Sequence, residues 1–184
     1  MGLVLTVLLV GVCRSSSAEG GVPLGLQALL VSRLVTFDRN FLARAGPVAK
    51  ILVLHRPGNS ESVFEGASMA RALGELEKIG GVPAKVEEGD YTDPEVLAQR
   101  CRAGGIALVY LTVGLESETR RIANALVGVD VLTVGTSARH AENGAVVGFA
   151  VEEARPKLVL NLKQAAAQNV KFKAEVLQLA RIVE

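Results

Sequence analysis

Short apolar runs alternate with longer amphipathic stretches through the middle of this chain. Four runs have the length of strands and are mostly apolar: residues 51–54, 84–86, 106–111 and 131–134. Three stretches between them carry apolar residues at helical spacing: residues 60–79, 92–102 and 116–127. Apolar strands separated by helices are typical of parallel pairing with right-handed crossovers, in a sheet covered on both faces. The pattern therefore predicts a mostly parallel βαβαβαβ core with helices on both faces.

A long amphipathic helix is expected before this core. Its apolar stripe consists of residues at helical spacing: Leu26, Leu30, Leu34, Phe37 and Phe41. Gly46 and Pro47 are expected to end the helix. The polar residues fall mostly away from the stripe and are expected to form a solvated face: Arg33, Asp38, Arg39 and Arg44.

After the core, the chain is expected to form an antiparallel hairpin at the edge of the sheet and then a final helix. A strand that starts at Val147 is separated by turn residues 153–156 from a second strand at residues 158–160. Between residues 174 and 183 the polar positions are spaced by three: Glu175, Gln178 and Arg181. This spacing predicts an apolar C-terminal helix with one narrow polar stripe, which needs cover from the first helix or from a second subunit.

The composition is that of a globular α/β protein. The chain has 184 residues, 49% of them hydrophobic and 4% aromatic, which suits one core and excludes a disordered or fibrous class. No internal repeat or domain boundary interrupts it. We therefore predict a single α/β domain at residues 26–184, after a linker at residues 19–25.

An apolar run from Leu3 to Val12 has the length of a signal-peptide core and is too short to span a bilayer. Small residues allow cleavage after Ala18, so residues 1–18 are predicted to be a signal peptide. The cationic segment that usually precedes such a run is missing, so a buried N-terminal strand stays open as an alternative, as does a start further upstream. Export implies a periplasmic protein with no membrane insertion after cleavage.

Cleavage would leave the chain formally neutral. The precursor has 20 basic and 19 acidic residues, and Arg14 is removed with the signal. A neutral chain offers no basic field, so no nucleic-acid partner is expected. Cys13 is removed as well, which leaves Cys101 without an intramolecular partner, either as a buried, inert side chain or as a reactive thiol.

The loops at the C-terminal ends of the predicted parallel strands are the candidate ligand site, because open α/β sheets bind ligands there. Five loop residues supply hydroxyls, an amide, flexible backbone or a helix N-terminus: Asn59, Ser60, Gly114, Thr136 and Ser137. The same residue types serve as ordinary helix caps, and that interpretation stays open. The loops lack the P-loop lysine and the three-glycine dinucleotide motif, so no nucleotide cofactor is expected.

No catalytic or metal site is expected. His55 and His140 are far apart in the sequence, lack a recognisable nucleophile nearby, and are expected at the surface. No group of His, Cys, Asp and Glu has metal-ligand spacing. A flavin is also disfavoured, because Tyr110 lies inside a predicted strand and Tyr91 is placed on the far side of the sheet from the loops. The chain is therefore expected to be neither an enzyme nor a cofactor-binding protein.

The end of the chain carries a recognisable succession of elements. A Gly-rich turn leads into a strand, a second strand ends in Leu-Asn, and an Ala-rich helix and a final Leu/Ala-rich helix follow. The positions are Gly144, Phe149, Leu160–Asn161, Ala165–Ala166 and residues 176–180. This succession resembles the closing motif of the YfiR/HmsC-like periplasmic family. VTFDRNFLARAG at residues 35–46 is similar to the opening helix of that family, and residues 132–149 are similar to its segment before the hairpin.

The resemblance implies an exported, non-enzymatic regulator that acts through protein contact and dimerisation. In the best-known member the partner is an inner-membrane diguanylate cyclase, whose repression lowers cyclic-di-GMP output and biofilm formation. The better-known members carry functional disulfides that the single mature cysteine here does not reproduce, so redox control is not implied.

We therefore expect a homodimer that contacts an inner-membrane signalling protein. The expected interface consists of Phe37, Phe41, Val176, Leu179 and Ile182. A periplasmic small-ligand-binding module that uses the loop residues is the alternative, and a hydrolase that uses His55 or His140 is a more distant one.

Overall fold

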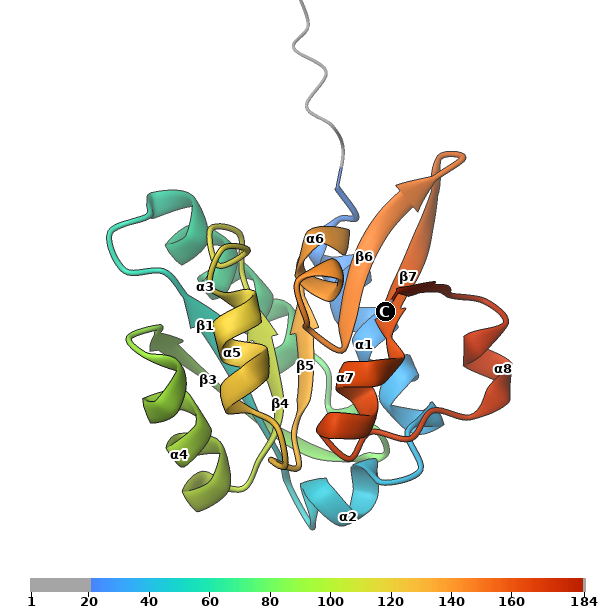
Figure 1. Cartoon of the computed structure of the whole chain (residues 1–184), viewed down its shortest axis with the longest axis horizontal. Helices are drawn as coiled ribbons and strands as arrows, with labels where there is room; N and C mark the ends of the chain where they lie inside the picture. Colours follow the sequence, from blue (N-terminus) through green and yellow to red (C-terminus); the bar gives the residue numbers. More distant parts are fainter. Residues whose placement is uncertain (1–20, 184) are drawn as a thin grey trace, which may run out of the picture.

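The chain folds around one eight-stranded sheet (Figure 1), and the computed structural model describes residues 21–183. The predicted signal peptide, residues 1–18, lies outside the described residues. The strands are β1 (Ala49–His55), β2 (Lys78–Ile79), β3 (Val82–Asp90), β4 (Ile106–Leu111), β5 (Leu132–Gly135), β6 (Val147–Glu152), β7 (Arg155–Asn161) and β8 (Arg181–Val183). The helices are α1 (Leu24–Leu34), the 3-10 turn η1 (Val35–Phe37), α2 (Phe41–Ala45), α3 (Ser60–Gly74), α4 (Pro94–Gly104), α5 (Thr119–Ala125), α6 (Ala138–Glu142), α7 (Leu162–Ala167) and α8 (Ala174–Leu177).

The strand order is β2-β3-β1-β4-β5-β6-β7-β8, and most neighbours run parallel. The antiparallel pairs are β2 with β3 and β6 with β7. The α/β fold with a parallel core and an antiparallel C-terminal hairpin is therefore confirmed. The hairpin is not the edge of the sheet, however, because β8 adds a further strand parallel to β7. None of the helices at residues 21–183 has both the length and the hydropathy that a membrane span requires.

Side chains of the central strands alternate between two hydrophobic cores, as the pleat of a strand requires. In β1, Ile51 and Val53 belong to the core beneath α1 and α3, whereas Leu52 and Leu54 belong to the core beneath α4 and α5. Figure 1 shows α4 and α5 in front of the sheet, with α1 behind it. Helices on both faces explain why the strands are apolar throughout.

The predicted long N-terminal helix is wrong, because it is broken into α1, η1 and α2. The break falls at Asp38, whose backbone is extended (φ −86°, ψ 114°) and forms an isolated antiparallel bridge with Phe172. Lys173 N also donates to the Phe37 carbonyl at 2.9 Å. Hydrogen bonds to the C-terminal segment thus replace the helical hydrogen bonds at this point. At its other end, α1 begins at Leu24, inside the predicted linker at residues 19–25.

The predicted apolar C-terminal helix is also wrong. α8 is a single turn that ends at Leu177, and Arg181–Val183 form β8 beside β7. Polar residues at three-residue intervals in an apolar segment suit a helix, but Ile182 and Val183 are β-branched and find a pairing partner in β7, which the local sequence does not reveal.

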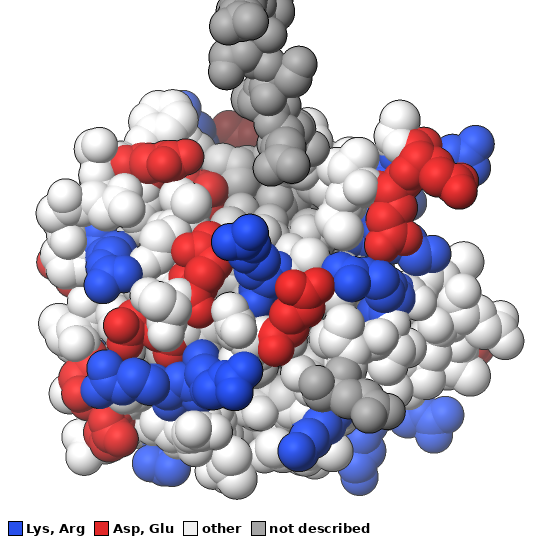
Figure 2. All heavy atoms as spheres, turned by 45° about the horizontal axis from the view of Figure 1, so that its top comes forward, with Lys and Arg blue, Asp and Glu red and all other residues white. Residues whose placement is uncertain are grey.

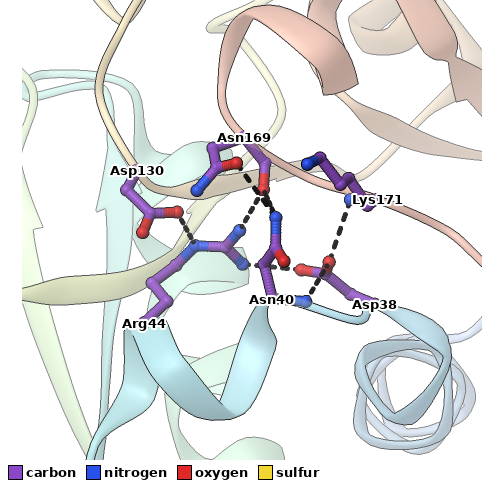
Figure 3. Close-up of polar contacts among 6 residues, drawn as sticks. All are labelled: Asp38, Asn40, Arg44, Asp130, Asn169 and Lys171. Atoms are coloured by element: carbon purple, nitrogen blue, oxygen red, sulfur yellow. Dashed lines mark hydrogen bonds and ion pairs between the residues drawn. The ribbon is translucent and has the colours of Figure 1, made fainter.

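A polar network around the buried Asp38–Arg44 ion pair joins the broken N-terminal helix to the C-terminal segment (Figure 3). The Arg44 guanidinium donates to Asp38 Oδ2 and to Asp130 Oδ1, both at 2.7 Å, and to the Asn169 carbonyl at 3.1 Å. Asp38 Oδ1 accepts from the backbone N–H of Lys171 at 3.0 Å and of Asn40 at 3.1 Å. The expected solvated face at Asp38 and Arg44 is therefore wrong, since their side chains are 0% and 2% exposed.

Two glycines allow α6 to lie directly on the sheet. A Cβ at Gly148 of β6 would come within 2.4 Å of the Ser137 carbonyl oxygen, and a Cβ at Gly135 of β5 would come within 2.1 Å of the His140 Cβ. Real Cβ atoms do not approach other atoms this closely, so only glycine fits at either position. The close approach buries His140 completely.

Charged side chains of both signs are intermixed over most of the face shown in Figure 2. This face therefore shows no large continuous field of one sign. Exposed ion pairs of the chain include Arg100 with Glu87 at 3.3 Å and Arg181 with Glu142 at 3.0 Å, and such pairs contribute little to stability.

Candidate functional site

The switch point of the sheet lies between β1 and β4. From β1 the chain passes through α3 to β3 on one side, and it returns through α4 to β4 on the other side of β1. Loops at such a point leave the sheet toward opposite faces, and ligands of open α/β sheets bind in the crevice between them. We call the space between residues 56–60 and 112–118 the switch-point crevice.

The two loops touch each other across the crevice. Arg56 Nη1 donates to the Gly114 carbonyl at 2.8 Å. Gly114 has a positive φ of +84°, and a Cβ there would lie 2.8 Å from Asn59 Nδ2. Asn59 Oδ1 in turn caps α3 by accepting from Ser62 N at 3.0 Å. The crevice is therefore closed by Arg56 and Asn59.

The floor of the crevice is a chain of buried hydroxyls. Thr112 Oγ1 donates to the Leu54 carbonyl at 2.9 Å, so Ser62 Oγ must donate the 2.7 Å bond that joins the two hydroxyls. Ser62 Oγ also accepts from Arg56 N at 2.8 Å. These bonds fix the first turn of α3 to the ends of β1 and β4.

Two carboxylates hold the backbone of the second loop. Glu65 Oε1 accepts from Val113 N at 3.0 Å, and Glu116 Oε2 accepts from Gly114 N at 2.7 Å. Burial raises the pKa of the Glu65 carboxyl above its ordinary value, against the opposing effect of the hydrogen bond from Val113. The nearby negative charge of Glu116 raises it further.

His140 lies beneath the same loops and is 0% exposed. Its Nδ1 is 3.0 Å from Ser137 Oγ, and no polar atom of residues 21–183 forms a hydrogen bond with its Nε2. Burial lowers the pKa of His140, and the Glu116 carboxylate and the Thr112 carbonyl oppose that shift. The expected surface position of His140 is thus wrong, whereas His55 is partly exposed and lies 3.3 Å from Asp90.

A second feature is the apolar surface at the outer edge of the sheet. Leu179 is 69% exposed and Ile182 is 40% exposed, and both belong to the segment from the end of α8 to β8. Among residues 21–183, β8 pairs with β7 alone, so its other edge is open. Open edges and exposed apolar side chains are both features of interaction surfaces.

In a comparison with protein families, residues 26–181 match the model of a family described as YfiR/HmsC-like. The chain belongs to the YfiR/HmsC-like family. This is a regulatory, non-catalytic family, and membership indicates a periplasmic regulator. A search of curated proteins finds no match.

Solved structures with a similar fold include a substrate-binding protein. A conserved domain protein from Vibrio cholerae has a TM-score of 0.61 and 14% identity, over 88% of this chain and 60% of the other. A ligand-free, open substrate-binding protein with adhesive properties from Clostridium difficile has a TM-score of 0.56 and 14% identity, over 79% of this chain and 57% of the other. An ABC domain in complex with L-Trp from Streptococcus pneumonia has a TM-score of 0.61 and 12% identity, over 85% of this chain and 60% of the other. This YfiR/HmsC-like chain spans about 60% of the length of these proteins, and the likeness is one of fold.

The five predicted ligand residues all lie at the C-terminal edge of the parallel strands. Asn59 and Ser137 occupy the N-cap positions of α3 and α6, Ser60 is the exposed first residue of α3, and Gly114 contacts Asn59. Thr136 Oγ1 lies 3.5 Å from Gln27 Nε2. Asn59 therefore acts as an ordinary helix cap, because its side chain accepts a hydrogen bond from Ser62 N.

Of the five predicted interface residues in this YfiR/HmsC-like chain, two are exposed. Leu179 and Ile182 reach the surface, and Phe37 is half-buried beneath Lys173 Nζ, which lies 5.9 Å from its ring centre. Phe41 and Val176 are 1% and 5% exposed because they pack inside the core of their own chain, so they present no surface to a partner.

The sequence reasoning missed Arg56, Glu65, Glu116 and the burial of His140. Glu65 lies about one turn after Ser62 on α3, so helical spacing would have placed it over the same loops. Tyr91 was also misplaced: its N–H donates to the His55 carbonyl at 2.8 Å, on the same edge as the crevice. Tyr91 is nevertheless buried at 8% exposure and offers no open ring face.

The fold should lose stability as the pH falls below about 6.5, the ordinary pKa of histidine. Because burial lowers the pKa of His140 in the folded state, the unfolded chain takes up the proton first, and protonation favours unfolding. The raised pKa of Glu65 acts in the opposite direction, since its protonation favours the folded state. Urea unfolding of the wild type and of His140→Asn between pH 7.5 and 5.5 separates the effect of His140 from that of Glu65. The free energy of unfolding of the variant should fall less over this pH range than that of the wild type. Equal declines in both proteins would rule out this role of His140.

Proposed function

We propose that this chain is an exported regulator that modulates an inner-membrane signalling protein, such as a diguanylate cyclase, by direct protein contact. The observation that carries this proposal is the YfiR/HmsC-like match over residues 26–181, which leaves only the ends of the described chain outside the family. The apolar run at residues 3–12, which is proposed to be a signal peptide, supports export.

The open edge of β8 supplies a surface suited to protein contact. Leu179 and Ile182 offer apolar side chains there, and the backbone of β8 offers unpaired hydrogen-bonding groups. Arg181 is held by Glu142 at 3.0 Å and by Glu152 at 3.3 Å, so its charge is compensated within the chain. A partner that covers Leu179 and Ile182 therefore does not have to neutralise Arg181.

Site-specific photo-cross-linking in the periplasm tests the contact. A photoreactive amino acid at Leu179 should give an adduct with an inner-membrane signalling protein. The same amino acid at Gln99, which is exposed on α4, serves as the control and should give none. Adducts with membrane proteins that form equally from both positions, or from neither, would contradict the proposed surface.

Homodimerisation is proposed on the same basis, and sedimentation of the mature protein tests it. A dimer at micromolar concentration that dissociates in Leu179→Glu would support self-association through this edge. A wild-type protein that sediments as a monomer under these conditions would exclude it.

A second candidate function is binding of a small ligand in the switch-point crevice. The observation that favours it is the set of polar groups gathered beneath Arg56: the hydroxyls of Ser62 and Thr112 and the carboxylates of Glu65 and Glu116. A ligand that replaces the 2.8 Å bond from Arg56 to Gly114 would open the crevice. A thermal-shift screen with nucleotides and amino acids tests this, because binding to the folded state must raise the melting temperature. No stabilisation by any of them would count against it.

A further inference from the structure

A separate groove lies on the same side of the sheet as α5, between that helix and the beginning of α7. Its volume is about 410 Å³, within the range of small-molecule sites. One wall is the face of α5 formed by Arg120, Ala123 and Asn124, and the other is formed by Asn161, Lys163 and Gln164. Figure 1 shows α5 and α7 on either side of β5, with α6 above. The groove shares no lining residue with the switch-point crevice or with β8, although Glu142 of its lining pairs with Arg181 of β8 at 3.0 Å.

Three amide side chains in this groove are fixed by bonds to backbone carbonyls. Asn161 Nδ2 donates to Ala141 O at 3.0 Å, Gln164 Nε2 donates to Ala123 O at 2.9 Å, and Asn143 Nδ2 donates to Glu116 O at 3.2 Å. The side-chain oxygen of Asn161 accepts from Gln164 N at 2.8 Å.

These bonds leave two acceptors in the groove. Within residues 21–183, no protein hydrogen bond reaches the side-chain oxygens of Asn143 and Gln164. Because their amide groups are already anchored through the nitrogens, both oxygens have defined positions without further loss of side-chain freedom. Fixed amide oxygens of this kind accept hydrogen bonds from hydroxyl groups.

The groove also carries uncompensated positive charge. Arg120 and Lys163 come from its opposite walls, and neither forms an ion pair with any described residue. The carboxylate that lines the groove, Glu142, is paired with Arg181 at 3.0 Å. The local balance therefore favours an anion, which Arg120 is able to bind through two parallel hydrogen bonds.

We propose that this groove binds a small, hydroxyl-rich anion of the acidic-sugar class, such as a sugar phosphate or a uronic acid. Arg120 and Lys163 bind the phosphate or carboxylate, and Asn143 and Gln164 accept from the sugar hydroxyls. The polar lining gives an apolar ligand little surface on which to pack. Its lining includes neither Leu179 nor Gly114, so variants at Arg120 and Lys163 test it separately from the proposed regulatory contact and from the crevice.

Titrations of the full mature chain, followed by amide NMR shifts, test the proposal with four probes: glucose 6-phosphate, glucuronate, glucose and inorganic phosphate. Glucose 6-phosphate or glucuronate should shift resonances at residues 120–124, 142–144 and 161–164. Glucose and inorganic phosphate should each bind at least about tenfold more weakly, because each retains only part of the contacts.

Arg120→Gln and Lys163→Gln should each weaken binding by about tenfold, which corresponds to the loss of one charge-assisted hydrogen bond. Both residues are exposed, so the variants should keep the wild-type melting temperature. Arg102→Gln, at an exposed arginine of α4, is the matched control and should bind like the wild type. The proposal is overturned if neither acidic sugar shifts these resonances, if inorganic phosphate binds as tightly as glucose 6-phosphate, or if the Arg120 and Lys163 variants bind unchanged.

Discussion

Replacing Arg44 with methionine is expected to lower the free energy of unfolding by about 3–5 kcal/mol, the cost of breaking a buried ion pair from one side. The Asp38 carboxylate is 0% exposed and would lose its 2.7 Å partner while it remained buried. The Asn169 carbonyl would also lose a donor. Because the network joins the broken N-terminal helix to the segment before α8, its loss should loosen both chain ends together. Urea denaturation at pH 7 measures the change.

Two further variants make this result specific. Arg100→Met removes an exposed pair with Glu87 and should cost less than about 1 kcal/mol. Adding Asp38→Asn to Arg44→Met should recover part of the loss, because asparagine keeps an acceptor for Lys171 N without a buried charge. A cost for Arg44→Met no larger than that of Arg100→Met would show that the buried network does not stabilise the fold.

Gly148→Ala is expected to destabilise the fold by about 1–3 kcal/mol, the usual cost of overpacking a core. The added Cβ would meet the Ser137 carbonyl oxygen at 2.4 Å, and this is a backbone atom that cannot rotate away. Relief of the clash requires α6 to move off the sheet, and that movement would expose His140. The expected variant therefore has a lower melting temperature in thermal unfolding.

Gly74→Ala is the matched control for this substitution. Gly74 is the last residue of α3, and a Cβ there would meet nothing within 4 Å. Alanine favours a helix over glycine by up to about 1 kcal/mol, so this variant should be neutral or slightly more stable. If both alanine variants have wild-type stability, α6 does not depend on the close approach at Gly148.

The parallel core was predictable because its strands are apolar on both faces. Ile51 to Leu54 and Leu108 to Leu111 alternate between the two cores, and a strand buried on both sides has few polar positions. The hairpin was predictable from the two strand patterns that flank residues 153–156, although the residues that form its turn, Glu153 and Ala154, adopt positive φ values that their side chains disfavour. In each case the signal lies within a few neighbouring residues.

The ends of the chain were not predictable because distant residues determine them. Asp38 leaves the helix and is buried only because Lys171, far along the chain, supplies an N–H. Arg181 to Val183 form a strand only because β7 lies beside them. His140 is buried only because Gly135 and Gly148 lack side chains. Local spacing carries no record of such partners.

In the candidate site, too, features set by neighbouring residues were predictable and features set by distant residues were not. The predicted succession of strands and helices correctly placed Asn59 and Gly114 where parallel strands end, while their role in ligand binding stays a prediction. Glu65 and Glu116 were missed because their role is to bind loop N–H groups, and any acidic residue on a predicted helix looks solvated in sequence. Leu179 and Ile182 were predicted to lie at an interface because they are apolar residues of an expected helix. That helix does not form, but both side chains are exposed.

Intracellular cyclic-di-GMP in the host bacterium tests the proposed regulatory contact most directly. Deletion of the gene should raise the cyclic-di-GMP level. Expression of the wild-type chain in the deletion strain should return the level to that of the undeleted strain. A Leu179→Glu/Ile182→Glu variant that is exported and folded to the wild-type level should fail to restore it, because two carboxylates cannot be buried unpaired in an apolar contact. Restoration by this variant, or an unchanged level in the deletion strain, would contradict the account.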